Sequence, residues 1–197
     1  TYTQTPSRGS SFIPTPEPLK NSKLGLISIK NEDNECFKYC LLYHQSEKGK
    51  NGERVSVLKK VVDKYKWDGV GFPVGFNDIT TFENNNQVCI NIYGCESDRE
   101  INPLRLGNMA YIKNEKIDLL LIIDKDGNGQ YLYIKRLESL LHTYTSNFYK
   151  DRKYCPYCRK TIPAEEVYED HVMSKHYNCN NTCNLELPLS GSTMNFK

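Results

Sequence analysis

The chain has 197 residues, of which 38% are hydrophobic and 25% are charged, and its formal net charge is +2. This length fits one ordinary domain with a small appendage, and this apolar content is enough for a core. The near-neutral charge gives no global argument for binding nucleic acid or a membrane surface. No apolar run approaches the roughly 18 residues that a membrane-spanning helix needs, so we expect no membrane partner.

The first part of the chain, residues 1–22, is rich in Thr, Ser and Pro. It carries too few apolar residues to fold alone, so we expect an arm or linker. The chain begins with Thr1 rather than Met and shows no secretory signal, which favours a fragment or a processed product.

A strand and a helix are predicted next. Leu24–Lys30 alternates like a short strand, and Asn34 is a good N-cap for a helix that runs to about His44. Cys36 then lies in the first helical turn, where the helix dipole lowers a thiol pKa and favours a nucleophilic thiolate. The alternative is that Cys36 and Cys40 are ordinary buried residues.

A second helix is predicted from Glu53 to about Trp67 by an apolar stripe. Its lysines, which include Lys59, Lys60 and Lys64, fall mostly off that stripe. They form either a solvated face or a face that contacts phosphates.

The middle of the chain predicts strands. They cover Gln87–Tyr93, Asp118–Asp124 and Gln130–Lys135, the last two joined by turn residues at 125–129. A short helix is expected at Asn77–Phe82 and another from Arg136 to about Tyr144. The turn resembles a calcium loop only superficially, because its glycine spacing is wrong and the final glutamate is missing. This order predicts an α+β fold with a mixed or antiparallel sheet.

A metal motif follows the sheet region. Cys155 and Cys158 form a Cys-x2-Cys pair, and twelve residues later His171 and His176 form a His-x4-His pair. Two thiolates on a turn and two imidazoles about one helical turn apart close a tetrahedron around Zn²⁺. Cys179 is the alternative fourth ligand, and a metal-free thiol pair is the alternative to the site itself. We therefore expect a small ββα zinc finger whose helix starts near residue 164.

The predicted finger helix is poorly suited to reading DNA bases. With His171 at helix position seven, the base-reading positions hold Ala164, Val167 and Asp170, and none makes the bidentate guanine contact of arginine. Nearby cations, Lys153, Arg159 and Lys160 among them, favour phosphate contacts without sequence choice. We expect a structural or protein-contacting zinc site.

Several segments resemble, in order, the N-terminal region of protein-primed B-family DNA polymerases of Maverick/Polinton elements and related viruses. They are Leu26–Cys40, Gly71–Val74, Asp78–Glu83, Ile90–Gly94, Asn102–Arg105, Leu119–Ile122 and Tyr133–Leu137. The zinc motif, Leu187-Pro188 and Met194–Lys197 follow at the positions expected for this family, so the resemblance spans residues 24–197. It implies a noncatalytic accessory module of a replication protein, or one derived from it, in the nucleus of a cell.

A more distant resemblance concerns papain-like cysteine hydrolases, in which a cysteine opens a helix and a histidine follows on a later hairpin. The related polymerase regions often have His-Tyr where this chain has Gln130-Tyr131. Glutamine cannot take the thiol proton, so this resemblance implies an inactive relative unless another imidazole serves. His44 and His142 are the histidines outside the metal motif.

The sequence thus predicts four parts. These are an arm (1–22), an α+β domain (23–148), a C2H2-like finger (149–183) and an extension (184–197). Four of the eight cysteines crowd around the metal motif, which fits a reducing intracellular compartment. The expected cofactor is Zn²⁺, and the expected partner is a protein, the remainder of a larger chain, or nucleic acid bound without sequence preference.

Overall fold

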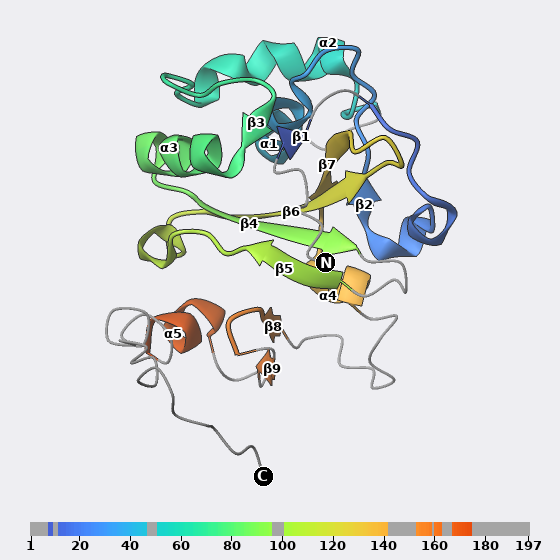
Figure 1. Cartoon of the computed structure of the whole chain (residues 1–197). Helices are drawn as coiled ribbons and strands as arrows, with labels where there is room; N and C mark the ends of the chain where they lie inside the picture. Colours follow the sequence, from blue (N-terminus) through green and yellow to red (C-terminus); the bar gives the residue numbers. More distant parts are fainter. Residues whose placement is uncertain are drawn as a thin grey trace, which may run out of the picture.

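A mixed β-sheet runs through the middle of the protein, with helices on one face (Figure 1). A small unit formed by residues 153–158, 160–162 and 167–174 lies below the other face. The structure is a computed structural model that describes residues 8–9, 12–46, 51–95, 101–141, 153–158, 160–162 and 167–174. The α+β class predicted from the sequence is confirmed, and of the two kinds of sheet that the sequence left open, mixed or antiparallel, the sheet is mixed.

Within these ranges the main sheet has seven strands in the order β3-β1-β7-β6-β4-β5, and β2 also pairs with β7. Parallel pairs join β4 to β6 and β1 to β7, and the other pairs are antiparallel. The strands are β1 Arg8–Gly9, β2 Leu26–Ile27, β3 Val74–Gly75, β4 Cys89–Cys95, β5 Ile101–Arg105, β6 Lys116–Ile123 and β7 Gly129–Ile134.

The predicted hairpin between β6 and β7 is confirmed. Asp124 Oδ1 accepts hydrogen bonds from the backbone N–H groups of Asp126 and Asn128, which closes the turn. The edge strand β5 was not predicted, because Asn102 and Pro103 suit a turn better than a strand interior.

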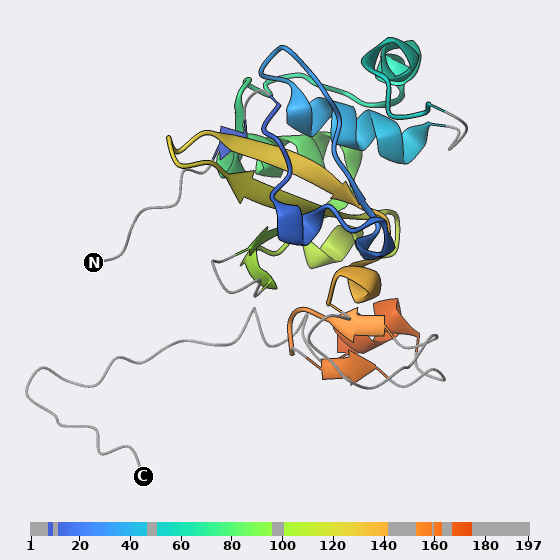
Figure 2. The ribbon, with the colours of Figure 1, turned by 90° about the vertical axis from the view of Figure 1, so that its right-hand side faces the viewer.

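The helices cover mainly one face of the sheet (Figure 2). Alternation along β6 and β7 sends Leu119, Leu121 and Tyr131 into the cluster under the helices, and sends their neighbours Leu120 and Leu132 to the opposite face. The helices are α1 Cys36–Gln45, α2 Val55–Leu58, α3 Phe76–Asn86, α4 Leu137–Leu141 and α5 Tyr168–Val172. Shorter 3-10 turns are η1 Glu17–Leu19, η2 Ser22–Leu24, η3 Lys59–Lys64 and η4 Met109–Tyr111.

Helix α1 is buried on nearly all sides, as its apolar sequence requires. Phe37 packs edge-on against Tyr131 of β7 and Phe82 of α3, with ring centroids 5.4 and 5.8 Å apart. Its N-cap is Glu35 rather than the predicted Asn34, because Asp33 Oδ1 accepts the Glu35 N–H and closes the turn one residue later.

Three other predicted elements differ from the structure. The expected helix at 53–67 is the short α2 followed by η3, because the backbone leaves helical geometry at Val61. The expected strand at 24–30 is reduced to β2, since η2 occupies its start. Helix α3 is longer than the predicted Asn77–Phe82 segment, and the Asp78 carboxylate accepts the Gly75 N–H at its start.

The described part of the predicted arm lies against the sheet. Ile13 and Leu19 are buried in the cluster on the face opposite the helices. Gln130 Oε1 accepts the Ile13 N–H at 2.8 Å, and Gln130 Nε2 donates to the Ile29 carbonyl. Residues 12–22 therefore belong to the packed body of the domain.

A separate two-stranded antiparallel sheet pairs β8 Lys153–Cys155 with β9 Lys160–Ile162, and α5 follows it. Helix α5 begins at Tyr168, four residues later than predicted, because Val167 is extended and serves as the N-cap. None of the helices in the described ranges has the length and apolarity required to cross a bilayer.

Candidate metal centre

Three of the predicted metal ligands converge in one place. The ligand atoms of Cys155, Cys158 and His171 all lie within 4.8 Å of one another. Cys158 Sγ and His171 Nε2 are 3.5 Å apart, which matches the spacing of about 3.5–3.8 Å between ligands of a tetrahedral zinc ion. Cys155 and His171 are buried, and Cys158 is half-buried.

Local structure explains this convergence. Cys155 ends β8, and the turn after it returns Cys158 to the same side. The His171 N–H donates to the Val167 carbonyl at 2.9 Å, so the imidazole is fixed by the first turn of α5. The sequence signal was the spacing, and the structure brings these three side chains close together.

The donor set suits a soft or borderline divalent cation. Burial, followed by the neighbouring Cys158 thiol, raises the pKa of Cys155 above its ordinary value. A cation held between the sulfurs would supply the positive charge that two adjacent thiolates need. The predicted fourth ligands, His176 and Cys179, lie outside the described residues.

The unit that carries these ligands is packed onto the α+β domain. Its buried side chains Tyr168 and Val172 share a hydrophobic cluster with Cys89, Met109 and Ile112 of the domain. This cluster is distinct from those on the two faces of the main sheet, so the unit has its own contact area.

Polar contacts reinforce this packing. Lys113 Nζ donates to Asp170 Oδ1 at 2.8 Å, and Lys116 Nζ lies 4.8 Å from the centre of the Tyr168 ring. The ion pair is largely exposed and contributes less than about 1 kcal/mol, so burial of the apolar side chains is the main cause of docking.

Two of the three predicted base-reading positions can be located. Asp170 is engaged by the protein's own Lys113, and Val167 is 55% exposed at the helix start. Ala164 lies outside the described residues. Neither located residue offers a donor to a base edge.

The predicted phosphate-contacting lysines fall into two groups on opposite sides of the protein. Lys59, Lys60 and Lys64 are exposed on η3, whereas Lys153 is exposed on β8 (Figures 1 and 2). Arg159 and the side chain of Lys160 lie outside the described parts of the chain. The two groups therefore do not form one continuous basic surface.

The environment of Cys36 is opposite to the one expected. Its thiol is 1% exposed, and burial raises its pKa to about 11 although backbone N–H groups act to lower it. The expectation of a lowered pKa is wrong, because desolvation of the thiolate outweighs the dipole of the short helix. Tyr131 N–H points at Cys36 Sγ, and Cys40 Sγ donates to the Tyr131 carbonyl at 3.3 Å.

Among the described residues, no histidine side chain contacts the Cys36 thiol. Gln130 faces Ile13 and Ile29, on the other face of β7 from Cys36. His44 lies eight residues further along α1, about 12 Å away along the helix axis. His142 lies outside the described residues, and the geometry that is described gives Cys36 no general base.

A polar group that the sequence did not predict lies between the C-terminal end of α1 and the start of β6. His44 Nε2 lies 2.9 Å from Glu115 Oε1, and His44 Nδ1 lies 2.9 Å from the Tyr133 hydroxyl. Beside them, Lys116 Nζ donates to Asp118 Oδ2 at 2.7 Å. The one available signal was Asp118 itself, a carboxylate near the start of a mostly apolar strand.

Comparison of the chain with protein-family models, with curated proteins and with solved structures gives no match. The proposals below therefore depend on the residues and on the sequence resemblance described above.

Proposed function

We propose that this chain is a noncatalytic zinc-binding accessory module of a DNA polymerase of transposons or viruses, or a protein derived from one. The observation that carries the proposal is the convergence of Cys155, Cys158 and His171 on one point. The link to a polymerase, and with it a nuclear location, rests on the order of the sequence motifs shared with that family.

Zinc in this module has a structural role. The unit of β8, β9 and α5 is too small to bury enough apolar surface for independent stability, and a metal compensates for this in small units. Three protein ligands come from β8, the following turn and α5, so the ion ties the strands to the helix. His176 or Cys179 completes the coordination.

The partner is a protein surface or the remainder of a larger chain. The apolar side of α5 is occupied by the α+β domain, and Asp170 already pairs with Lys113. A helix held in this way cannot enter a major groove without undocking. Contact with nucleic acid is therefore weak, sensitive to salt and indifferent to sequence.

Metal analysis of the purified chain tests the zinc site. We expect about one zinc per chain, lost in Cys155→Ser and in Cys158→Ser because each removes a thiolate ligand. Cys95→Ser is the matched control, since Cys95 lies at the end of β4 and is not one of the three clustered ligand residues, and it keeps its zinc. His176→Ala and Cys179→Ala identify the fourth ligand by which of them loses the metal. A zinc-free wild-type chain, or a Cys155→Ser variant that keeps full occupancy, would remove the basis of the proposal.

Nucleic-acid binding is tested by electrophoretic shift over a range of salt concentrations. We expect a weak shift that disappears near physiological salt and that Lys59→Gln, Lys60→Gln and Lys64→Gln together reduce, with Lys23→Gln as the control. A tight, sequence-selective shift at physiological salt contradicts the proposed mode of binding.

A further inference from the structure

The two thiols of the metal centre differ in their access to solvent. Cys155 is fully buried at the end of β8, whereas Cys158 is half-buried on the turn that follows. Their sulfur atoms lie within 4.8 Å of each other. A Cys-x2-Cys pair is also the arrangement that dithiol oxidoreductases convert between dithiol and disulfide. The pair is therefore suited to two-electron oxidation as well as to metal binding, with Cys158 as the accessible sulfur.

A third cysteine, Cys89, lies between this unit and the domain. It is the first residue of β4, is fully buried, and belongs to the same hydrophobic cluster as Cys155, Tyr168 and Val172. Burial raises the pKa of the Cys89 thiol to about 12, so the sulfur is both protonated and shielded while the unit is docked. The reactivity of Cys89 therefore reports whether the unit covers the domain.

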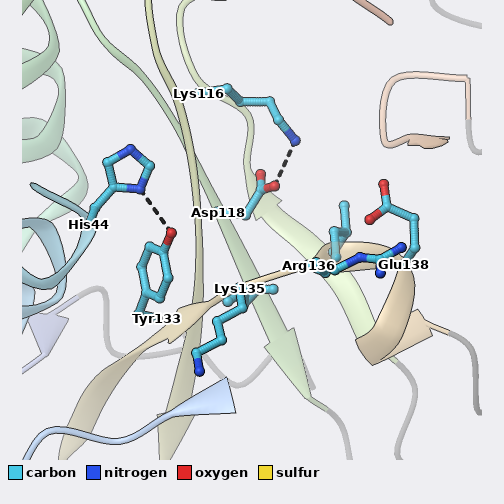
Figure 3. A pocket seen from close by; sticks show the side chains of 9 residues that line it. His44, Lys116, Asp118, Tyr133, Lys135, Arg136 and Glu138 are labelled. Carbon is cyan, nitrogen blue, oxygen red and sulfur yellow. Dashed lines mark hydrogen bonds and ion pairs between the residues drawn. The ribbon is translucent and has the colours of Figure 1, made fainter. Parts of the chain in front are cut away.

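The edge of this contact is polar. Lys116 Nζ lies 4.8 Å from the centre of the Tyr168 ring and donates to Asp118 Oδ2 at 2.7 Å (Figure 3). Both Lys116 and Asp118 line a pocket of about 310 Å³, whose other walls are the end of α1, the end of β7 and the start of α4. Since the ion pair between Lys113 and Asp170 is also largely exposed, the apolar cluster and the metal are what keep the unit in place.

Oxidation of the cysteine pair removes the negative charges that a metal ion needs. A disulfide has no thiolate, so His171 is the one member of the three clustered ligands that remains a donor. The unit then lacks the link between its strands and α5, and it is too small to stay folded by burial alone. Departure of Tyr168 and Val172 from the domain exposes Cys89.

We propose that Cys155 and Cys158 form a redox pair whose oxidation to a disulfide by hydrogen peroxide releases the metal and uncovers Cys89. This inference rests on the zinc site proposed above and adds the regulation of that site. The oxidant enters at Cys158, because Cys155 is fully buried.

The reaction has two steps. The Cys158 thiolate attacks one oxygen of the peroxide, the O–O bond breaks, and the departing hydroxide takes a proton from solvent. The Cys155 thiolate then attacks the sulfur of the Cys158 sulfenic acid: an S–S bond forms, the S–O bond breaks, and the second hydroxide is protonated. The two sulfurs together lose two electrons, and the peroxide gains them to become two molecules of water.

The test treats the zinc-loaded full chain with hydrogen peroxide and follows three quantities. A chromogenic chelator measures released zinc, mass spectrometry of unreduced peptides locates the disulfide, and a short iodoacetamide pulse measures the exposure of each cysteine. We expect release of about one zinc per chain and a disulfide between Cys155 and Cys158. We also expect labelling of Cys89 to become at least about tenfold faster, because the unit no longer covers it.

Other residues of the chain provide internal controls. Cys36 and Cys40 are buried in the cluster under the helices, so their labelling stays low before and after oxidation. Dithiothreitol with added zinc restores the protection of Cys89, because a thiol reduces a disulfide but does not repair a methionine sulfoxide at Met109 or Met173.

Cys155→Ser separates oxidation from metal loss. This variant lacks one metal ligand and one partner of the disulfide, so Cys89 is labelled rapidly without peroxide, and peroxide adds no further change. Protection of Cys36 in the same sample shows that the domain stays folded. Cys95→Ser responds to peroxide as the wild-type chain does, because Cys95 is not one of the clustered ligands.

Four results overturn the proposal when the untreated chain contains zinc. They are zinc retained under peroxide, Cys89 still protected after zinc release, a disulfide that joins Cys155 or Cys158 to another cysteine, and exposure of Cys89 that dithiothreitol and zinc do not reverse. A wild-type chain without zinc before treatment overturns the proposed function as well, so the two failures are distinguishable.

Discussion

At the scale of single residues, the polar network beside β4 depends on one glycine. Glu83 is buried, and its carboxylate accepts from Ile90 N–H and Asn108 N–H and pairs with Arg105. The backbone of Gly107 passes through this group and donates to Asn91 Oδ1 at 2.9 Å. A carboxylate at this depth is tolerated because its hydrogen-bond partners are N–H donors, one of them the Arg105 guanidinium.

Gly107→Ala is expected to destabilise the fold by about 3 kcal/mol or more. The new Cβ would lie 2.5 Å from Ile90 N and 2.6 Å from Glu83 Oε1, and neither atom can move without breaking the network. Gly127→Ala is the control: its φ of +83° is strained for alanine, but the space around it is open, so it costs about 1 kcal/mol. Urea unfolding midpoints measure both, and equal losses would contradict the crowding at Gly107.

Cys36 is expected to resist alkylation in the folded protein. With a pKa of about 11, only about one thiol in a thousand is ionised at pH 8, and the sulfur is also shielded from solvent. Peptide mass spectrometry after a short iodoacetamide pulse should show Cys36 unmodified in the native chain and modified in denaturant. Rapid labelling of the native chain that is abolished by Cys36→Ser would support the alternative interpretation as a cysteine hydrolase.

At the scale of elements, α5 is joined to the domain mainly by Tyr168. Its ring is buried in the cluster with Met109 and Ile112, and both Lys116 and Lys153 lie over its faces. Its hydroxyl is buried without a hydrogen-bond partner among the described residues. The ring therefore stabilises the docked helix, and the hydroxyl does not.

Two substitutions at Tyr168 separate these contributions. Tyr168→Ala should cost about 3–5 kcal/mol, because it removes a buried aromatic ring. Tyr168→Phe should leave stability within about 0.5 kcal/mol or raise it slightly, because no hydrogen bond is lost. The control is Tyr39→Phe, which loses a 2.7 Å hydrogen bond to Asp33 and should destabilise by about 1 kcal/mol. Chemical unfolding measures all three, and a large loss in Tyr168→Phe would show that the hydroxyl has a partner.

The elements that the sequence predicted best are those with a strong local signal. The apolar run of β6 and the turn at Asp124 define the hairpin, and the spacing of Cys155, Cys158 and His171 predicts that these candidate ligands lie together. In a 3-10 helix, side chains on one face recur about every three residues, which is close to the period of an α-helix. The residues of η3 were therefore predicted to be α-helical. The pocket could not be predicted, because its residues come from four elements that only the tertiary fold brings together.

At the scale of the whole molecule, the metal-ligand unit and the α+β domain share buried surface. Cys89 and Ile112 of the domain are covered by Val172 and Tyr168 of the unit. A domain ending at residue 148, as predicted from the sequence, would expose this patch. The two parts are therefore expected to unfold together while the metal is bound.

Removal of the metal is expected to lower the melting temperature of the whole chain by roughly 5–10 °C, because disorder of α5 uncovers the shared cluster. Differential scanning calorimetry with and without a chelator measures this shift. Cys155→Ser should melt at the lower temperature and should not respond to the chelator. Loss of zinc with an unchanged melting temperature would show that the two parts are independent.

Lys116 takes part in both the pocket and the docking of α5, because its ammonium contacts Asp118 on one side and the Tyr168 ring on the other. The position of this ammonium therefore affects the free energy with which α5, the helix that carries His171, stays on the domain. Thermodynamic linkage makes this effect reciprocal: whatever shifts the ammonium toward Asp118 changes the affinity of the His171 site for a metal, and binding of the metal changes the free energy of that shift by the same amount.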